Sequence, residues 1–457
     1  MKGFSLVKDP SFYKRFFSIW SVLVLYNMIT LGVNLADNVM VGTLGETALS
    51  GVTAVNQVQF LFHQLILGSS DAVVVLGSQY WGQKRTKEIK RFSVGALLLG
   101  SAIGLVLFLL AAFVPEAVVG IFTESAEIRA AGVEYLSVIK YSYVLFALTN
   151  LLLAVLRSVE TVRIGFWVSL STLFVNISLN YLLIGGHLGF PALGVRGAAI
   201  ATLAARCVEL VIVVAYLLNE KKLSWRFQDF LPRDRVLIRD YLKLCRPFLF
   251  TAFLFGSASA LQTVILGHMT DIAISANSVS NTLYQMLKVA AIGAASAASI
   301  LIGTAIGSGK KEVIRSYTQT LQLMFLSIGL CISLSLFLLR APVIGLYKNL
   351  TEETKTMATH FIWILCFTGF GTAYEMPVIT GIIRGGGDAK FVFINDLISI
   401  WGIVIPLSFL AAFVFHWSPE AVILCLNADQ VFKCIPGAIK ANRYHWMKKL
   451  TRDASAS

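Results

Sequence analysis

The sequence predicts an all-α membrane protein with twelve transmembrane helices in two pseudo-symmetric six-helix bundles. Hydrophobic residues make up 56% of its 457 residues and charged residues only 14%, and the mean hydropathy is +0.74. This composition excludes an ordinary soluble surface. The chain has twelve apolar runs of about 20 residues, the length that crosses a hydrocarbon core about 30 Å thick. It also repeats itself at a constant offset of 225 residues.

The repeat aligns residues 42–82 with residues 267–307 without a gap. Identical residues recur at matching positions, such as Gly42 with Gly267 and Asn56 with Asn281. Each copy is apolar enough to lie in lipid. The repeat therefore indicates two related membrane bundles with a site between them.

The apolar runs follow one another with six in each copy of the repeat. The predicted spans are residues 16–36, 53–77, 92–113, 135–156, 165–186, 197–218, 247–267, 273–302, 318–340, 359–382, 391–414 and 420–440. They predict an N-terminal lobe of residues 1–218, a cytoplasmic linker of residues 219–246 and a C-terminal lobe of residues 247–457 that ends in a cytoplasmic tail. Within the linker, residues 233–244 are amphipathic and form either an interfacial helix or a solvated connector.

Lysine and arginine are concentrated in the N-terminal segment, in the loops between even- and odd-numbered spans, and at the C-terminus. Because basic loops remain cytoplasmic, both termini are predicted to lie inside the cell. The net charge of +13 follows from this topology. It does not indicate nucleic-acid binding, since the basic residues lie on loops between spans and not on one folded face.

Ionisable residues inside predicted spans are costly in hydrocarbon, so each is a functional candidate. Two pairs share a helix face and are interpreted as structural, Asp429 with Lys433 and Arg206 with Glu209. Asp396 lies near the cytoplasmic end of its span, from where its side chain can reach the membrane surface. The acids left over outnumber the bases, which suits a cationic ligand; they are Asp37, Asp71, Glu375 and Asp396, set against Lys288.

Asp37, at the outer end of the first span, is the strongest candidate for binding a coupling ion. Its repeat counterpart in the seventh span is the uncharged Gln262, so ion coupling is expected in the first bundle. Asn176 and Asn180 lie one turn apart in the fifth span, and Thr202 lies in the sixth. Carboxylate, amide and hydroxyl oxygens suit a hard cation. For the two asparagines, hydrogen bonding between helices is the alternative.

Residues 186–202 read Gly-His-Leu-Gly-Phe-Pro-Ala-Leu-Gly-Val-Arg-Gly-Ala-Ala-Ile-Ala-Thr. This stretch resembles the P-x-L-G-V-x-G-A-A-x-A-T signature of the multidrug and toxic compound extrusion (MATE) family. Three shorter stretches are also similar to family motifs, residues 37–42, 79–82 and 384–388. The likeness covers nearly the whole chain.

The resemblance implies twelve helices in two lobes around a central cleft that opens alternately to the two sides of the membrane. A protein of this kind is not an enzyme and needs no cofactor. It is a secondary active antiporter that exports cationic amphiphilic small molecules in exchange for protons or sodium. The resemblance also implies a monomer in the plasma membrane of a bacterium.

In the resembled family a cation site is built from an aspartate in span one, an Asn-x-x-x-Asp pair in span five and the threonine that ends the Ala-Thr element. These positions carry over onto Asp37, Asn176, Asn180 and Thr202, which would also hold Na⁺. Position 180 departs from the family, because it is asparagine where aspartate is common. Losing that carboxylate weakens sodium binding. It favours Asp37 as a proton carrier, since burial favours the neutral form of a carboxyl group.

Weaker candidates point to the substrate pocket. Glu375 stands where many relatives have asparagine and can hold a cationic substrate, and Asp71 replaces a residue that is usually small and neutral. A broad apolar pocket lined by aromatic and methionine side chains is expected. Its candidate wall residues, for which plain packing is the alternative, are Phe62, Tyr141, Tyr284 and Met286.

Two other transport functions compete with this prediction, a flippase for lipid-linked precursors and an exporter of one specific metabolite in the same superfamily. A flippase would place basic groups in its cleft, but Lys288 is essentially the only unpaired base within the spans. An intramembrane enzyme would need a nucleophile with a base, or a histidine-rich metal motif. The one histidine near a span centre, His63, has no such partner in the sequence.

Overall fold

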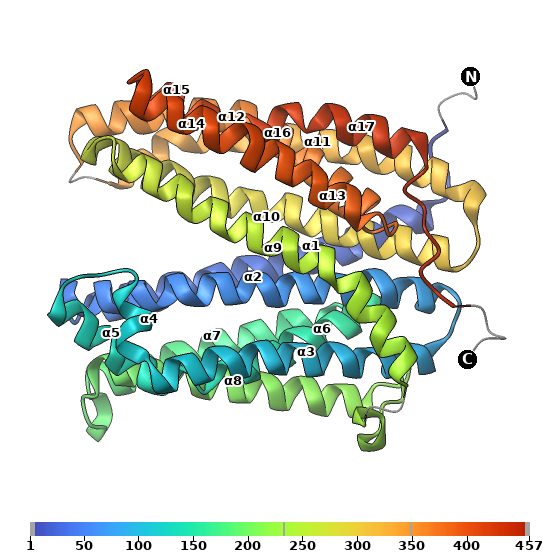
Figure 1. Ribbon diagram of the computed structural model, residues 1–457, viewed down its shortest axis with the longest axis horizontal. Helices are drawn as coiled ribbons and strands as arrows, with labels where there is room; N and C mark the ends of the chain where they lie inside the picture. Colours follow the sequence, from blue (N-terminus) through green and yellow to red (C-terminus); the bar gives the residue numbers. More distant parts are fainter. Residues whose placement is uncertain (1–4, 232–233, 348–349, 453–457) are drawn as a thin grey trace. The chain divides into compact units, whose positions relative to one another are not determined.

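The computed structural model describes residues 5–231, 234–347 and 350–452, and all regular secondary structure in this part of the chain is helical (Figure 1). Eleven of the described helices are long and apolar enough to cross a membrane, and a bent pair raises the number to twelve. The predicted all-α membrane fold is therefore confirmed.

The helices of the first repeat are α1 (Pro10–Gly42), α2 (Glu46–Gly82), α3 (Thr86–Phe113), α4 (Pro115–Gly120), α5 (Ala126–Ile139), α6 (Ser142–Ser158), α7 (Arg163–Ile184) and α8 (Gly194–Asn219). Those of the second repeat are α9 (Arg235–Gly267), α10 (Asp271–Gly307), α11 (Lys311–Leu346), α12 (Glu352–Met376), η3 (Pro377–Ile383), α13 (Ala389–Asp396), η4 (Leu397–Val404), α14 (Ile405–Phe409), η5 (Leu410–Val414), α15 (Pro419–Leu426), α16 (Asp429–Phe432) and α17 (Cys434–Arg443).

The repeat is visible in the helix boundaries. Helices α1 and α9 both have 33 residues, and α2 and α10 both have 37. Helix α9 begins and ends 225 residues after α1, and α10 begins and ends 225 residues after α2, which is the offset that relates the two copies in sequence. The match in the primary structure therefore reflects two copies of the same helical unit.

The fourth predicted span, residues 135–156, is not one straight helix. It divides into α5 and α6, which are bent by 55° relative to each other. At the bend, the Ser142 hydroxyl donates to the backbone oxygen of Ile139 at 2.7 Å. Such a local bond offers the backbone an alternative to regular helix and helps to bend it.

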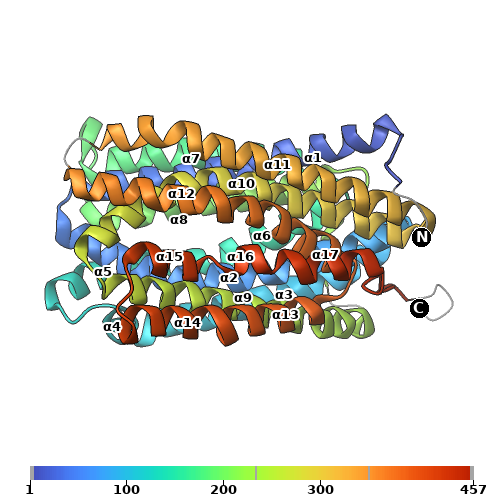
Figure 2. The same cartoon turned by 90° about the horizontal axis from the view of Figure 1, so that it is seen from above.

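Spans ten to twelve are also irregular. Helix α12 continues into the π-helix η3 at Pro377, and the eleventh span contains two further π-helices, η4 and η5. The twelfth span is divided into α15, α16 and α17, which follow one another in line in Figure 2. π-helical segments are rare in proteins, and those that occur are often found at functional sites.

The chain forms two compact units. The N-terminal unit comprises Leu25–Gly77 and Lys84–Leu249, and the C-terminal unit comprises Met1–Val24, Ser78–Gln83 and Phe250–Ser457. The first part of α1 therefore belongs to the C-terminal unit, where the Trp20 indole donates to the backbone oxygen of Ala290 at 2.9 Å.

The first part of α9 belongs in turn to the N-terminal unit. There the Tyr241 hydroxyl lies 2.6 Å from the Ser69 hydroxyl, and both residues are fully buried. Leu237 is buried as well. The amphipathic stretch considered as an interfacial helix is thus, from Arg235 onward, the packed beginning of α9.

Two repeat-related glycines allow the last turns of α2 and α10 to lie against each other within the C-terminal unit. A Cβ atom on Gly82 would collide with the backbone oxygen of Thr304, and one on Gly307 would collide with the backbone oxygen of Gln79. Only glycine leaves room for backbone at this distance.

We expect Gly307→Ala to lower the thermal unfolding temperature of the purified protein, because overpacking costs about 1–3 kcal/mol. The matched control is Gly32→Ala on α1, where an added Cβ has no neighbour within 4 Å. Equal unfolding temperatures for the two variants would show that the close approach is not needed.

The Arg384–Asp388 stretch forms a tight turn, with Gly387 at a φ of +102°. Asp388 forms ion pairs with Lys448 at 2.7 Å and Lys440 at 2.9 Å. Burial alone would raise the pKa of the Asp388 carboxyl, but the hydrogen bonds from the two lysines outweigh it and hold the pKa below its ordinary value. The residues after α17 are thereby fastened to the C-terminal unit.

Candidate functional site

Asp37, Asn176, Asn180 and Thr202 lie together in the N-terminal unit, on α1, α7 and α8. The Asn180 amide nitrogen donates to Asp37 Oδ1 at 2.5 Å and to Asn176 Oδ1 at 3.2 Å. The Asn176 amide nitrogen donates in turn to Thr202 Oγ1 at 3.4 Å. One continuous chain of hydrogen bonds therefore joins the four residues that the sequence singled out.

Close packing of α7 against α8 positions this cluster. Asn176 and Asn180 lie one turn apart on α7, and at most 1% of either side chain is exposed. On α8, Gly197 lies against the backbone oxygen of Leu183, where a Cβ atom would collide. The glycine of the Val-Arg-Gly-Ala-Ala element thus brings Thr202 within reach of Asn176.

The polar contacts continue one turn further along the same two helices. The Thr172 hydroxyl donates to Glu209 Oε1 at 2.8 Å, and Arg206 pairs with Glu209 Oε2 at 2.8 Å. The predicted Arg206–Glu209 pair is confirmed. Thr172 was missed by the sequence reasoning, although its spacing of four residues from Asn176 places it on the same face of α7.

An aromatic stack covers the Arg206 side chain. Its guanidinium lies 5.0 Å from the centre of the Phe146 ring. The His63 ring stacks on the same phenylalanine with ring centres 4.0 Å apart. Phe62, a candidate for the pocket wall, is 4% exposed and packs against Tyr143 and Phe146. In the N-terminal unit, Phe62 is therefore part of the packed core.

The weaker substrate candidates are divided between the units. Phe62, Asp71 and Tyr141 belong to the N-terminal unit, and Tyr284, Met286 and Glu375 belong to the C-terminal unit. Asp71 and Glu375 are partly buried, and Tyr141 and Met286 are exposed. The Tyr284 side chain is buried, and its hydroxyl lies within hydrogen-bonding distance of the Thr372 hydroxyl at 2.8 Å and the Gln430 side-chain oxygen at 3.1 Å.

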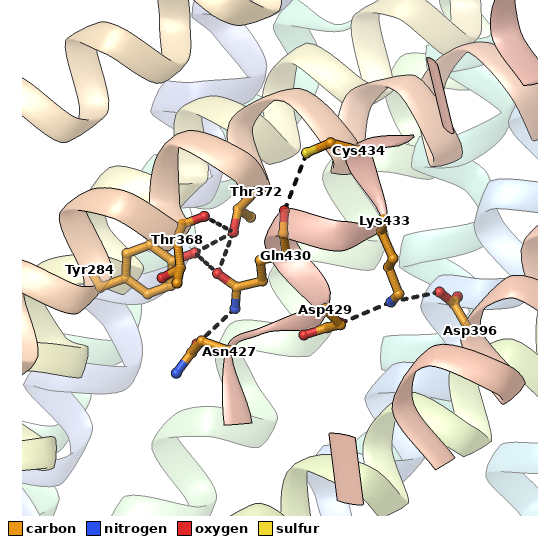
Figure 3. A network of polar contacts seen from close by, with 9 residues as sticks. All are labelled: Tyr284, Thr368, Thr372, Asp396, Asn427, Asp429, Gln430, Lys433 and Cys434. Atoms are coloured by element: carbon orange, nitrogen blue, oxygen red, sulfur yellow. Dashed lines mark hydrogen bonds and ion pairs between the residues drawn. The ribbon is translucent and has the colours of Figure 1, made fainter. Parts of the chain in front are cut away.

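The C-terminal unit holds a second polar cluster (Figure 3). Lys433 pairs with Asp429 at 2.9 Å, as the four-residue spacing predicted, and also with Asp396 at 2.9 Å. The Asp396 carboxylate thus contacts a lysine from a different helix. The two residues are 37 positions apart, so local spacing could not reveal this pair.

The Asn180 side chain lies between the Asp37 carboxylate and the Asn176 amide. The Asn180 amide nitrogen, a donor, stands between Asp37 Oδ1 and Asn176 Oδ1. Asn180 Oδ1 has no hydrogen-bond partner among the described residues. Nor, in that part of the chain, do three His, Cys, Asp or Glu side chains gather to hold a metal ion.

The sequence model of the family described as MatE matches residues 23–182 and 247–410. The chain belongs to the MATE family of transporters. The two matched segments correspond to the two copies of the repeat, so the MATE assignment and the internal symmetry agree.

Curated MATE relatives match the chain over most of its length. The protein called "Probable multidrug resistance protein NorM" of Halalkalibacterium halodurans is 25% identical over 402 residues, which are 87% of each chain. The protein of the same name from Thermotoga maritima is 24% identical over 408 residues, covering 89% of this chain and 87% of the relative.

Solved structures share the fold. A MOP superfamily transporter from Pyrococcus furiosus superposes with a TM-score of 0.85 at 17% identity, and the match covers 95% of this chain and 97% of the other. A MATE transporter of Vibrio cholerae gives a TM-score of 0.84 at 18% identity, with coverage of 96% and 98%. The MATE fold is thus retained at low sequence identity.

Proposed function

We propose that this MATE transporter is a multidrug efflux antiporter of the bacterial plasma membrane. It exports organic cations in exchange for protons by alternating access, with both termini in the cytoplasm. The NorM relatives, named as multidrug resistance proteins, support the substrate class. Sodium is the alternative coupling ion, and the experiment below separates it from protons.

The observation that carries the proposal is the set of hydrogen bonds around Asp37. One carboxylate is held by amide side chains, and the nearest partner group is an N–H donor. Such an arrangement supports uptake and release of a proton by Asp37. It supports sodium less well, because a hard cation needs several oxygens and gains affinity from each added carboxylate.

The same contacts suggest how the ion drives transport. A proton from outside neutralises Asp37, which removes the charge that the Asn180 amide stabilises. The hydrogen bonds to α7 then differ between the charged and neutral forms of the carboxyl group. A ligand shifts a conformational equilibrium only through such a difference in binding. Protonation thereby favours the state that releases the organic cation outward.

The test is efflux of ethidium from proteoliposomes that contain the purified protein. An imposed proton gradient is expected to drive ethidium efflux, whereas a sodium gradient at constant pH is expected to leave it at the rate of empty liposomes. Efflux driven by sodium alone would reverse the choice of ion. No efflux under either gradient would favour the flippase or the exporter of one specific metabolite.

A further inference from the structure

The last described residues, 444–452, continue from α17 without regular helix (Figure 1). Trp446 in this segment is fully buried, and a Cβ atom on Gly386 would collide with its ring. The backbone nitrogen of Lys448 donates to the backbone oxygen of the same Gly386 at 2.9 Å. This segment, the tail, is therefore packed on the turn of residues 384–388.

The N-terminal unit contains a related arrangement. The segment after α8 lies on the loop before α7, where Lys222 donates to the Thr161 hydroxyl at 3.0 Å, and its Trp225 is 2% exposed. This loop matches the turn beneath the tail, because Glu160 and Gly387 hold equivalent positions of the repeat and both have a positive φ, of 59° and 102°. In each copy, a lysine and a buried tryptophan thus hold the segment after the last span to its own unit.

The tail has one further partner, the last turn of α2. Gln79 on α2 is fully buried. Its side-chain nitrogen donates to the backbone oxygen of Lys448 at 3.0 Å, and its side-chain oxygen accepts from the backbone nitrogen of Leu450 at 2.8 Å. Gln83 donates to the Thr451 hydroxyl at 2.6 Å, and Thr451 is 7% exposed. Side chains at the end of α2 therefore bind the tail through its backbone and one hydroxyl.

Helix α2 is divided between the two units. Up to Gly77 it belongs to the N-terminal unit, and only from Ser78 onward does it belong to the C-terminal unit. It is nevertheless one continuous helix of 37 residues without a proline, so it has no built-in break at which its last turn could bend away. When the rest of α2 moves with the N-terminal unit, its last turn therefore has to leave the tail.

The two contacts of the tail differ in kind. Its contact with α2 consists of hydrogen bonds between neutral groups, which have a small net strength because water replaces them when they open. Its contact with its own turn adds the buried ring of Trp446 and the ion pair of Lys448 with Asp388 at 2.7 Å. A buried aromatic ring removes a large apolar area from water. On separation, the tail is thus expected to stay on its turn while α2 leaves.

We propose that the tail is a latch for α2. It holds the last turn of α2 in the C-terminal unit in one state of the transport cycle, and it releases this turn in the state that takes up substrate from the cytoplasm. The tail itself remains on the turn of residues 384–388 in both states. This inference rests on the proposed export by alternating access and names a contact that has to open in each cycle.

The test measures release of α2 as the rate at which N-ethylmaleimide modifies Thr451→Cys in the purified protein in detergent. Mass spectrometry of the tail peptide separates this position from the six native cysteines. In this background, Gln79→Met removes two hydrogen bonds between α2 and the tail and keeps a side chain of similar size. It is expected to raise the labelling rate about tenfold, the effect of losing two neutral hydrogen bonds.

The matched control is Gln322→Met in the same background. Gln322 is also a buried glutamine of the C-terminal unit, but its side chain bonds to Asn442 on α17 and Tyr374 on α12. This variant is expected to leave the labelling rate unchanged. An equal rise in both variants would mean that labelling reports unfolding of the unit. That result would overturn the inference, as would an unchanged rate in Gln79→Met.

A second measurement separates a latch from a static clasp. Saturating ethidium, whose binding is followed by its own fluorescence, is expected to raise the labelling rate of Thr451→Cys, because a ligand favours the state to which it binds more tightly. Ethidium that binds without changing the labelling rate would overturn the latch. If ethidium does not bind, the proposed export of organic cations fails, whereas the comparison of Gln79→Met with Gln322→Met still decides whether the tail releases α2.

Discussion

Asp37→Asn is expected to reduce proton-driven ethidium efflux to the rate of empty liposomes. Asparagine has nearly the same size as aspartate and can still accept the hydrogen bond from Asn180. It cannot take up or release a proton in the physiological range. The substitution therefore removes the titrating group while leaving the packing of α1, α7 and α8 in place. Initial efflux rates in proteoliposomes, under the same imposed proton gradient, measure the effect.

The matched control for this prediction is Asp9→Asn, at the residue directly before the same helix. Asp9 precedes α1, and its side chain accepts hydrogen bonds from the Ser11 backbone and hydroxyl at 2.9 and 2.5 Å. Asparagine caps the start of a helix about as well as aspartate, so transport is expected to continue. Normal efflux by Asp37→Asn would exclude Asp37 as the coupling residue.

The positions of the membrane spans could be predicted because they depend on chain composition. An apolar run of the right length must be helical in lipid, where every backbone group needs an internal partner. The helix interruptions could not be predicted in the same way. The shift to π-helix at Leu397 and the bend beside Ser142 depend on which carbonyl accepts each hydrogen bond, and hydropathy does not record that choice.

The two polar clusters differ in how well the sequence could reveal them. Asn176 and Asn180 are one turn apart, so local spacing places them on one face, and the family resemblance adds Asp37 and Thr202. Lys433 has one partner at such a spacing and another on α13. The second contact depends on how helices distant in sequence pack together, and a single sequence carries no direct signal for it.

Asn180→Asp is expected to give the transporter a sodium dependence that the wild type lacks. The change replaces the amide donor between Asp37 and Asn176 by oxygen and adds a second carboxylate to the cluster. Oxygens would then converge from Asp37, Asn176, Thr202 and position 180, and each added charge strengthens binding of a hard cation. Without a cation, the two carboxylates would repel each other.

Thermal unfolding of the purified variant in sodium or potassium chloride measures this effect. A ligand at 100 times its dissociation constant stabilises the folded state by about 2.7 kcal/mol, so saturating sodium should raise the unfolding temperature of Asn180→Asp over its value in potassium. The matched control is Asn219→Asp at the end of α8, whose amide donates to the Ala215 backbone oxygen and which lies outside the Asp37 cluster. A sodium-specific shift in the wild type would contradict the prediction, since it would mean that one carboxylate and neutral oxygens already bind the ion.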